Sequence, residues 1–303
     1  MEVLGTGGDV PAARLAEAAS TADGLITLLT DRVTRALLES APRLRVVGNF
    51  AVGYDNVDVP AATELGVQVC NTPNVLTEAT ADLAFSLLLA AARRIVEADR
   101  YVRQGAFRKW DPGRFLGRAV SGTTLGIVGF GRIGKAVARR GLGFGMRILY
   151  TGPRRAAPDA ERALAAEFVD KETLLRSSDF VSLHAPLTDE TRHLIDRAAL
   201  ALVKPGSVLV NTARGALVDE TALADALASG PLGAAALDVF EHEPDVVPAL
   251  RGLDNVVLAP HIGSATLETR IRMADAITAD VLGVLMGEPP KSPVNHPQRP
   301  RGR

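Results

Sequence analysis

The chain has 303 residues, a length typical of about two domains. Hydrophobic residues make up 47% and charged residues 23%, so the chain can bury a core and is not mainly disordered. Lys and Arg number 34 against 35 Asp and Glu, which leaves no basic excess for a dedicated nucleic-acid-binding protein. The single cysteine, Cys70, excludes an intrachain disulfide and suits a reducing compartment.

Neither a targeting signal nor a membrane-spanning run is recognisable in the sequence. The start MEVLGTGGDVP lacks a basic segment followed by an apolar one, and the apolar stretch at residues 83–92 is too short to cross a bilayer. We therefore expect a cytoplasmic protein that binds neither membranes nor nucleic acids. No group of His, Cys or Asp has the spacing of metal ligands, so we predict no metal.

Short apolar segments alternate with helical patterns, which predicts βαβ units and mostly parallel sheets. The first part of the chain is expected to form strands at residues 22–29, 44–47 and 66–69, and a helix at 34–40. A long apolar helix is expected from Thr77 to about Arg100, followed by an irregular loop at 104–122.

The middle of the chain has a second series of strand-like and helical segments. Six strands are expected, at residues 124–129, 147–150, 180–183, 207–211, 234–237 and 256–258. Helices are expected at residues 132–142, 219–229 and 265–286, and the proline-rich tail after them is expected to be extended or frayed. This order predicts two α/β domains with two crossings of the chain. Residues 1–72 and 265–303 would form a discontinuous substrate domain, and residues 73–264 a dinucleotide-binding domain.

A glycine motif indicates the cofactor. Residues 129–134 read Gly-Phe-Gly-Arg-Ile-Gly, which is G-x-G-x-x-G, and they follow an apolar strand and open a helix, as the motif requires. Gly129 permits the tight turn, Gly131 lets the backbone approach a pyrophosphate, and Gly134 allows the helix to pack closely on the strand. The helix N-terminus supplies N–H groups to the anion. The alternative is a tight turn without a ligand.

The end of the next strand favours NADP(H) over NAD(H). An NAD-binding fold has an acidic residue about 20 residues after the glycines to bind the ribose 2′-hydroxyl, but residues 135–158 contain none. Arg154 and Arg155 stand there instead, and guanidinium groups suit the oxygens of a 2′-phosphate. NAD(H) stays possible, since the two arginines form only a solvated turn in the alternative interpretation.

Three charged residues follow three of the late strands. Arg214 lies in the segment Asn-Thr-Ala-Arg-Gly, Glu243 precedes Pro244, and His261 lies in Ala-Pro-His-Ile-Gly. Loops at the carboxyl ends of parallel strands face the ligand crevice, so these side chains are expected to meet beside a nicotinamide. The cation would bind and polarise a 2-oxo acid, the imidazole would transfer a proton, and the carboxylate would orient the imidazole.

The sequence resembles the D-isomer-specific 2-hydroxyacid dehydrogenase family, over about residues 22–295. Within that family it most resembles glyoxylate/hydroxypyruvate reductases. The residues that carry this resemblance are AVGYDN at 51–56, NTPNVLT at 71–77, GIVGFGRIG at 126–134 and ILY at 148–150, in addition to the three charged motifs.

The resemblance implies a fold and a reaction. The fold would be two Rossmann-like domains with a cleft between them, one a flavodoxin-like substrate domain and the other a doubly wound dinucleotide-binding domain. The reaction would be reduction of a small 2-oxo acid to the D-2-hydroxy acid, with His261 as proton donor, Glu243 as its partner and Arg214 on the substrate. The family has one more βα unit before the segment that starts here, so the substrate domain is expected to lack that unit or to be rearranged.

The resemblance also implies binding roles for further residues. Val52 and Gly53 would bind the substrate carboxylate through their amides, and Leu76 would line the substrate pocket. Trp110 would lie in the dimer loop of a homodimer and reach the active site of the partner subunit, or else serve as simple packing. The residues that would line the cofactor are Thr80, Arg132, Ile133, Pro186, Thr191, Thr212 and Asp238, with Arg132 and Ile133 at the pyrophosphate.

Two other functions fit the same motifs. The first is another enzyme of the family, such as a 3-phosphoglycerate dehydrogenase, although the missing acidic residue and the lack of a regulatory domain argue against its common form. The second is a dinucleotide-sensing protein resembling the C-terminal-binding-protein corepressors, which keep the same three charged residues. An assay with 2-oxo acids separates an enzyme from a sensor.

Overall fold

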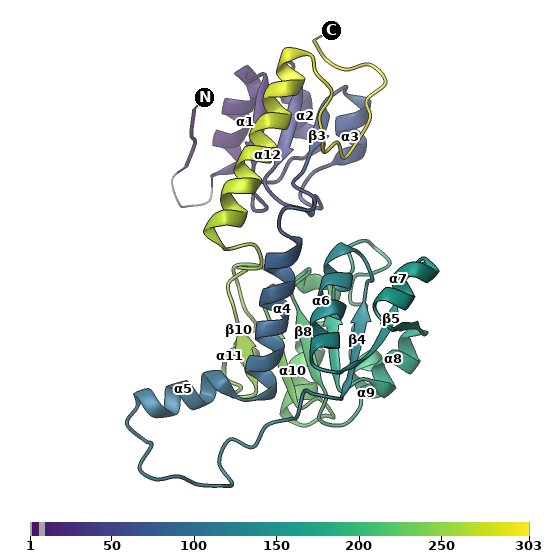
Figure 1. The fold of residues 1–303 in the computed structure, drawn as a ribbon. Coiled ribbons are helices and arrows are strands. Elements are labelled where there is room, and N and C mark those ends of the chain that lie inside the picture. The colour runs from purple at the N-terminus through teal and green to yellow at the C-terminus, as the bar shows by residue number, and fades with distance from the viewer. Residues whose placement is uncertain (1, 6–9, 303) are drawn as a thin grey trace. The chain divides into compact units, whose positions relative to one another are not determined.

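The computed structural model describes residues 2–5 and 10–302. The chain divides into two compact units, one formed by residues 1–76 and 264–303 and the other by residues 77–263. Figure 1 shows the course of the chain through both. Among the described residues, no helix is both long and apolar enough to cross a membrane.

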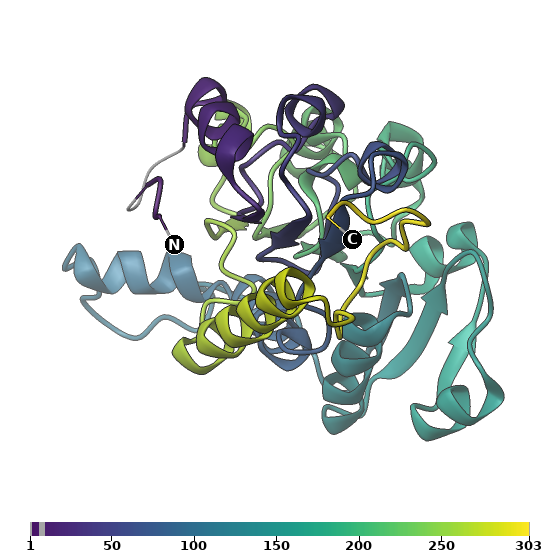
Figure 2. The ribbon, with the colours of Figure 1, turned by 90° about the horizontal axis from the view of Figure 1, so that it is seen from above.

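The first unit has a parallel three-stranded sheet with the order β1-β2-β3. The strands are β1 (Gly24–Thr27), β2 (Val46–Asn49) and β3 (Gln68–Cys70). Figure 2 shows helices α1 (Ala12–Thr21), α2 (Arg35–Ser40) and α3 (Val59–Glu64) on one face and α12 (Leu267–Met286) on the other. Neighbouring residues of a strand enter opposite cores, since Val47 packs with the first three helices and Val46 with Ile277 and Val281 of α12.

Of the two forms expected for the tail after α12, extended or frayed, the structure has an extended tail that is held by side-chain hydrogen bonds. The Asn295 side chain accepts a hydrogen bond from Val69 N at 2.7 Å and donates one to Val67 O at 3.0 Å. The guanidinium of Arg301 donates to the carbonyls of Leu65 and Ala41. These bonds hold in place a segment whose prolines prevent regular structure. They also satisfy backbone groups at the edge of β3 and after α2 and α3.

The second unit has a seven-stranded parallel sheet with the order β10-β9-β8-β7-β4-β5-β6. Its strands are β4 (Thr124–Val128), β5 (Arg147–Thr151), β6 (Ala166–Phe168), β7 (Phe180–Leu183), β8 (Val208–Asn211), β9 (Ala234–Leu237) and β10 (Val256–Leu258). The helices are α4 (Thr77–Ala92), α5 (Ile95–Arg103), α6 (Arg132–Gly143), α7 (Pro158–Ala163), α8 (Lys171–Ser177), α9 (Arg197–Leu202), α10 (Glu220–Ala228) and α11 (Pro248–Arg251), with a 3₁₀ turn, η1 (Gly215–Leu217). The sequence predicted six of these strands and missed β6.

Both faces of this sheet are buried, which explains why its strands are continuous apolar runs. Val208 and Val210 of β8 pack into the core that includes α4 and α6, whereas Leu209 packs into the core that includes α8, α9 and α10. Asp170, Asp196 and Asp219 begin the helices of the second core, each accepting a backbone N–H of the first turn.

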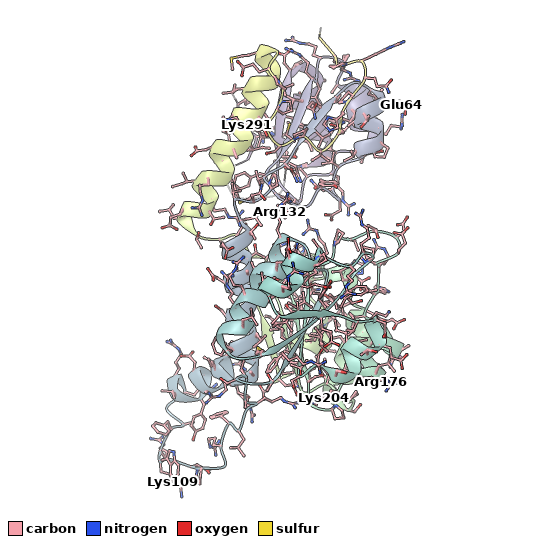
Figure 3. The ribbon with its side chains drawn as sticks, turned by 45° about the vertical axis from the view of Figure 1, so that its right-hand side comes forward. Glu64, Lys109, Arg132, Arg176, Lys204 and Lys291 are labelled. Atoms are coloured by element: carbon pink, nitrogen blue, oxygen red, sulfur yellow. The ribbon has the colours of Figure 1, made fainter. Side chains whose placement is uncertain are left out.

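The long helix expected from Thr77 to about Arg100 is two helices. α4 ends at Ala92, and Arg94 adopts a left-handed conformation with φ of 54° before α5 begins. The carbonyl of Ala92 accepts the N–H of Arg118 at 2.8 Å, so a segment distant in sequence takes the acceptor that a continuing helix would use. α5 and the irregular loop after it extend away from the rest of this unit, with Lys109 in the loop (Figures 1 and 3).

Candidate active site

The site of the second unit lies where the order of the strands reverses. The chain runs from β4 to β5 and β6 on one side, and then from β7 to β10 on the other. The turns after β4 and β7 are in close contact, since a Cβ at Gly129 would lie 2.5 Å from Ala185 N. The carboxyl edge of a parallel sheet at such a reversal is where open α/β sheets bind ligands.

The glycine turn has the geometry that a dinucleotide needs. Gly129 has φ of 94°, a region open to glycine, and a Cβ at Gly134 would lie 2.2 Å from Gly129 O. Space in front of Gly131 is open, because a Cβ there would meet nothing within 4 Å. In the described part of the chain no side chain caps α6, so its first N–H groups, near Arg132 and Ile133, are available to an anion. Figure 3 shows Arg132 at this edge of the sheet and Lys204 at the opposite edge.

The two arginines predicted to contact a 2′-phosphate lie just after β5 and differ in their partners. Both side chains are exposed. Arg155 forms a two-point ion pair with Glu161 of α7, with bonds of 2.9 and 3.0 Å. Among the described residues, Arg154 has no hydrogen-bond or ion-pair partner.

Backbone hydrogen bonds connect the ends of β8, β9 and β10, which carry the three predicted catalytic residues. Asp238 N donates to Asn211 O at 2.9 Å, and His261 N donates to Asp238 O at 2.8 Å. A Cβ at Gly215 would lie 1.8 Å from the carbonyl carbon of Phe240, so the turn after β8 packs directly on the turn after β9. The sheet edge therefore fixes the backbones that present these side chains.

His261 and Glu243 form the pair that the sequence predicted. His261 Nδ1 lies 2.8 Å from Glu243 Oε2, and Glu243 Oε1 accepts the N–H of Phe240 at 3.0 Å. Burial works to raise the pKa of Glu243, but the hydrogen bond and charge of His261, the Phe240 N–H and the charge of Arg214 outweigh it and hold the pKa below its usual range. Glu243 is therefore a carboxylate that holds one ring nitrogen and leaves Nε2 for a substrate. His261 has φ of 54°, an uncommon conformation for a non-glycine residue.

Arg214 is positioned by Asn211, a residue that the sequence analysis did not identify as functional. The buried Asn211 amide donates to Arg214 O at 2.8 Å and accepts from Ala213 N at 3.1 Å, which fixes the turn after β8. The Arg214 guanidinium donates to Ala213 O at 2.8 Å. The signal in the sequence was the Asn-x-x-Arg spacing at a strand end, since Asn side chains stabilise such turns.

Two buried polar atoms beside this pair fit a nicotinamide carboxamide. Asp238 Oδ1 accepts the N–H of Ile262 at 2.7 Å, whereas Asp238 Oδ2 and Thr212 Oγ1 are buried without a hydrogen-bond partner among the described residues. Such atoms are costly unless a ligand satisfies them. Burial raises the pKa of Asp238, which favours its protonated form. A Cβ at Gly263 would lie 3.3 Å from Asp238 Oδ2 and 3.4 Å from the Thr80 methyl group, so the Asp238 and Thr80 side chains border the same position.

The loop after β7 is held by its own side chains. Thr191 Oγ1 donates to Pro186 O and accepts from Thr188 N, both at 2.7 Å. His184 Nε2, at the start of the loop, lies 2.8 Å from Ser182 Oγ, and burial lowers the His184 pKa to about 4, so the ring is neutral at neutral pH. Within residues 2–5 and 10–302, no cluster of three or more His, Cys, Asp or Glu side chains is arranged to hold a metal.

In the first unit, the loop that carries Val52 and Gly53 is fixed through its carbonyls. Ala51 O accepts the N–H of Thr72 at 2.9 Å, and Val52 O accepts the Asn71 amide at 2.8 Å. In a trans peptide the next N–H points opposite to the carbonyl. The N–H groups of Val52 and Gly53 therefore both point away from the loop after β3, and neither has an acceptor in the part of the chain that the structure describes.

A buried amide pair supports this loop. The Asn49 side chain donates to Gly53 O at 2.8 Å and exchanges hydrogen bonds of 3.1 Å with the Asn56 side chain, while the Thr27 hydroxyl donates to Asn49 Oδ1. The sequence analysis identified the loop but not the Asn49, Asn56 and Asn71 side chains that orient it. The signal available was Asn49 and Asn71 at or next to strand ends and Asn56 in the loop between them, which is weak alone.

The two remaining predicted substrate residues differ in exposure. Leu76 is buried at the end of the first unit's N-terminal segment, whereas 79% of Trp110 is exposed in the loop after α5. The same stretch exposes Val102, Phe107 and Leu116.

The fold and this edge of the sheet define a nicotinamide-dinucleotide-dependent oxidoreductase, in which a carboxylate-bound histidine and an arginine follow the late strands. Residues 85–263 match the family model described as "D-isomer specific 2-hydroxyacid dehydrogenase, NAD binding domain". The chain belongs to this family.

Relatives and solved structures agree with that assignment. The glyoxylate reductase of Thermococcus litoralis is 54% identical over 289 residues, which cover 94% of this chain and 87% of that protein. A crystal structure of a protein from Thermus thermophilus has a TM-score of 0.89 and 46% identity, covering 95% of this chain and 91% of its own. A glyoxylate reductase structure from Paecilomyes thermophila has a TM-score of 0.86 and 35% identity, covering 93% and 88%.

Proposed function

We propose that this protein reduces glyoxylate, hydroxypyruvate or a similarly small 2-oxo acid to the D-2-hydroxy acid and prefers NADPH to NADH. The observation that carries the proposal is the 2.8 Å pair of His261 Nδ1 and Glu243 Oε2 at the sheet edge that also carries the glycine turn. The named activities of the relatives support the substrate class. The exposed Arg154 after β5, which has no ion-pair partner among the described residues, supports the cofactor preference.

When bound, the reduced nicotinamide supplies a hydride to C2 of the substrate, so the cofactor is oxidised and the 2-oxo acid reduced. His261 donates the accompanying proton from Nε2 to the 2-oxygen, while Glu243 holds Nδ1 and stabilises the ring. Arg214 binds the substrate carboxylate and polarises the carbonyl. In the first unit, the outward N–H groups of Val52 and Gly53 are donors suited to a carboxylate. Leu76 and Trp110 contribute to substrate selection.

The cofactor is assigned to residues of the second unit. Asp238, Thr212 and Thr80 hold the carboxamide end, and the first turn of α6, at Arg132 and Ile133, holds the pyrophosphate against the glycines. Pro186 and Thr191 line the cofactor on the β7 side. Arg154 and Arg155 face the ribose 2′-position.

An assay of nicotinamide oxidation tests the proposal, with NADPH and NADH each paired with glyoxylate, hydroxypyruvate, pyruvate and 3-phosphohydroxypyruvate. The smallest 2-oxo acids with NADPH should give the highest kcat/KM, and His261→Ala should lower kcat by on the order of 10²–10⁴. A wild type that prefers NADH refutes the cofactor assignment. No turnover with any 2-oxo acid, despite dinucleotide binding, would instead favour a sensing role.

We also propose that the protein is a homodimer that uses α5 and the loop after it. This segment exposes a row of large apolar side chains (Ile95, Val96, Val102, Phe107, Trp110 and Leu116). Light scattering after gel filtration should give twice the chain mass, and Phe107→Asp with Leu116→Asp should give the monomer mass. A cytoplasmic location remains a prediction from the sequence.

A further inference from the structure

A carboxylate from α7 reaches the end of β5, where the sequence analysis found only arginines. Glu161 lies on a short surface helix, yet its side chain is only 11% exposed. The Tyr150 hydroxyl donates to Glu161 Oε1 and accepts the N–H of Ala156 at 2.8 Å. The carboxylate is therefore fixed to the strand and to the loop that follows it.

Glu161 distinguishes the two neighbouring arginines. Arg155 donates from Nε to Glu161 Oε1 at 2.9 Å and from NH2 to Oε2 at 3.0 Å, so two of its five N–H donors are already directed at a carboxylate. These bonds and the Tyr150 hydroxyl hold the pKa of Glu161 below its usual range, so it is ionised at neutral pH. Arg154 is exposed and has no such partner among the described residues.

The same network is connected to the glycine turn. The Tyr150 ring stacks on the Phe130 ring, with their centroids 4.0 Å apart, and Phe130 stands between Gly129 and Gly131. A charge at the end of the strand after the glycine turn is placed where this fold recognises the adenosine ribose. Glu161 is held beside the end of that strand by Tyr150 and Arg155, although it lies outside the usual sequence window.

We propose that Glu161 is a specificity-determining residue for the cofactor. By holding Arg155 and adding a negative charge, it weakens the attraction for a 2′-phosphate, so that Arg154 is the main phosphate-binding cation and NADH is admitted alongside NADPH. This inference rests on the assignment of the NADP(H) 2′-phosphate to the end of β5, made under the proposed function. The inference concerns how strongly NADPH is preferred over NADH and which residue limits that preference.

Glu161→Gln tests the proposal, since the amide oxygen can still accept the Tyr150 hydroxyl while the charge is lost. The control is Asp159→Asn, which removes an equal charge from the same helix, where Asp159 pairs with Arg162 instead. Dissociation constants of NADP⁺, NAD⁺, 2′,5′-ADP and 5′-AMP are measured by calorimetry at fixed salt, and kcat/KM for NADPH and NADH is measured alongside.

Glu161→Gln should raise the ratio of NADP⁺ to NAD⁺ affinity about 3- to 10-fold, the range for one partly exposed charge, and should raise 2′,5′-ADP affinity in parallel. Asp159→Asn should leave both unchanged, and Arg154→Ala should weaken NADP⁺ binding. If Glu161→Gln lowers the Tm, Arg155→Ala is compared with the double variant Arg155→Ala/Glu161→Gln instead. The double variant should bind NADP⁺ more tightly than Arg155→Ala does.

The outcomes separate the two proposals. A ratio that stays unchanged in Glu161→Gln, or changes equally in Asp159→Asn, overturns the role of Glu161 and leaves the NADPH preference standing. A wild type that binds NAD⁺ more tightly than NADP⁺ refutes the preference, while an increase of the ratio in Glu161→Gln still supports the role of Glu161.

Discussion

Glu243→Gln removes the charge beside His261 while keeping the size of the side chain. In the wild type, Glu243 Oε1 accepts the Phe240 N–H at 3.0 Å and Oε2 lies 2.8 Å from His261 Nδ1. If the Gln oxygen keeps the Phe240 bond, its NH₂ group faces Nδ1. That arrangement favours the neutral ring with its proton on Nε2 and removes the anion that stabilises the imidazolium.

The size of the effect follows from the exposure of the pair. A hydrogen bond to a charged partner contributes about 1.5–3 kcal/mol, and side-chain exposures of 30% and 35% reduce this to about 1–2 kcal/mol. Since 1.36 kcal/mol corresponds to a factor of ten, kcat/KM for reduction at neutral pH should fall about 5- to 30-fold. The loss should appear in kcat/KM for reduction and not in NADPH affinity, because Glu243 acts on the group that donates the proton.

The assay is the pH profile of kcat/KM for glyoxylate reduction, between about pH 5 and pH 9, with NADPH affinity measured separately. The matched control is Glu241→Gln, because Glu241 Oε1 lies 2.6 Å from Nε2 of a different histidine, His193. The control should keep the wild-type profile. If the profiles of Glu243→Gln and Glu241→Gln coincide, Glu243 does not act through His261.

Three further predictions concern groups outside this pair. Burial raises the pKa of Glu220, so the folded chain binds that proton more tightly than the unfolded chain and loses stability as the pH rises through the raised pKa. In Glu220→Gln the side-chain oxygen can still accept the Glu241 N–H, while the buried charge is lost. The Tm of this variant should exceed that of the wild type by a margin that grows from about pH 5 to about pH 8. A margin that stays constant with pH would contradict the effect of the raised pKa. Burial raises the pKa of the Cys70 thiol to about 12, so a thiol reagent at about pH 8 should label it only after denaturation, and rapid labelling of the folded protein would be the opposite result. Asn71→Ala removes the donor to Val52 O and should raise KM for the 2-oxo acid about 5-fold, with NADPH affinity unchanged; equal losses in both would indicate general unfolding instead.

The strands of the second unit were predictable because burial on both faces makes them continuous apolar runs between turn residues. β6 was not, because Ala166-Glu167-Phe168 is a short edge strand that pairs only with β5 in the described residues, and Glu167 is exposed. The break after α4 was not predictable either. Its cause is the Arg118 N–H, which reaches the Ala92 carbonyl from beyond α5 and the loop, and no local pattern records such a contact.

The charged residues of the site were predictable for a topological reason. Arg214, Glu243 and His261 each follow a strand, and parallel strands end at the same edge, so their order in the sequence already implies proximity. The residues that orient the site were not, since Asn211 and Asn71 act by donating to specific carbonyls. Those bonds exist only once the turns have their final shape, and an Asn at a strand end has many other uses.

Glu161 illustrates why an absence in a sequence window is weaker evidence than a presence. Residues 135–158 contain no acidic residue, and that absence favoured NADP(H). The structure brings a carboxylate to the same place from α7, 11 residues beyond Tyr150, because the helix folds back over the end of β5. The cofactor responds to charge in space rather than to position along the chain. The two arginines are therefore unequal in their partners, and on our proposal the preference between NADPH and NADH is a balance between Arg154 and the Arg155–Glu161 pair.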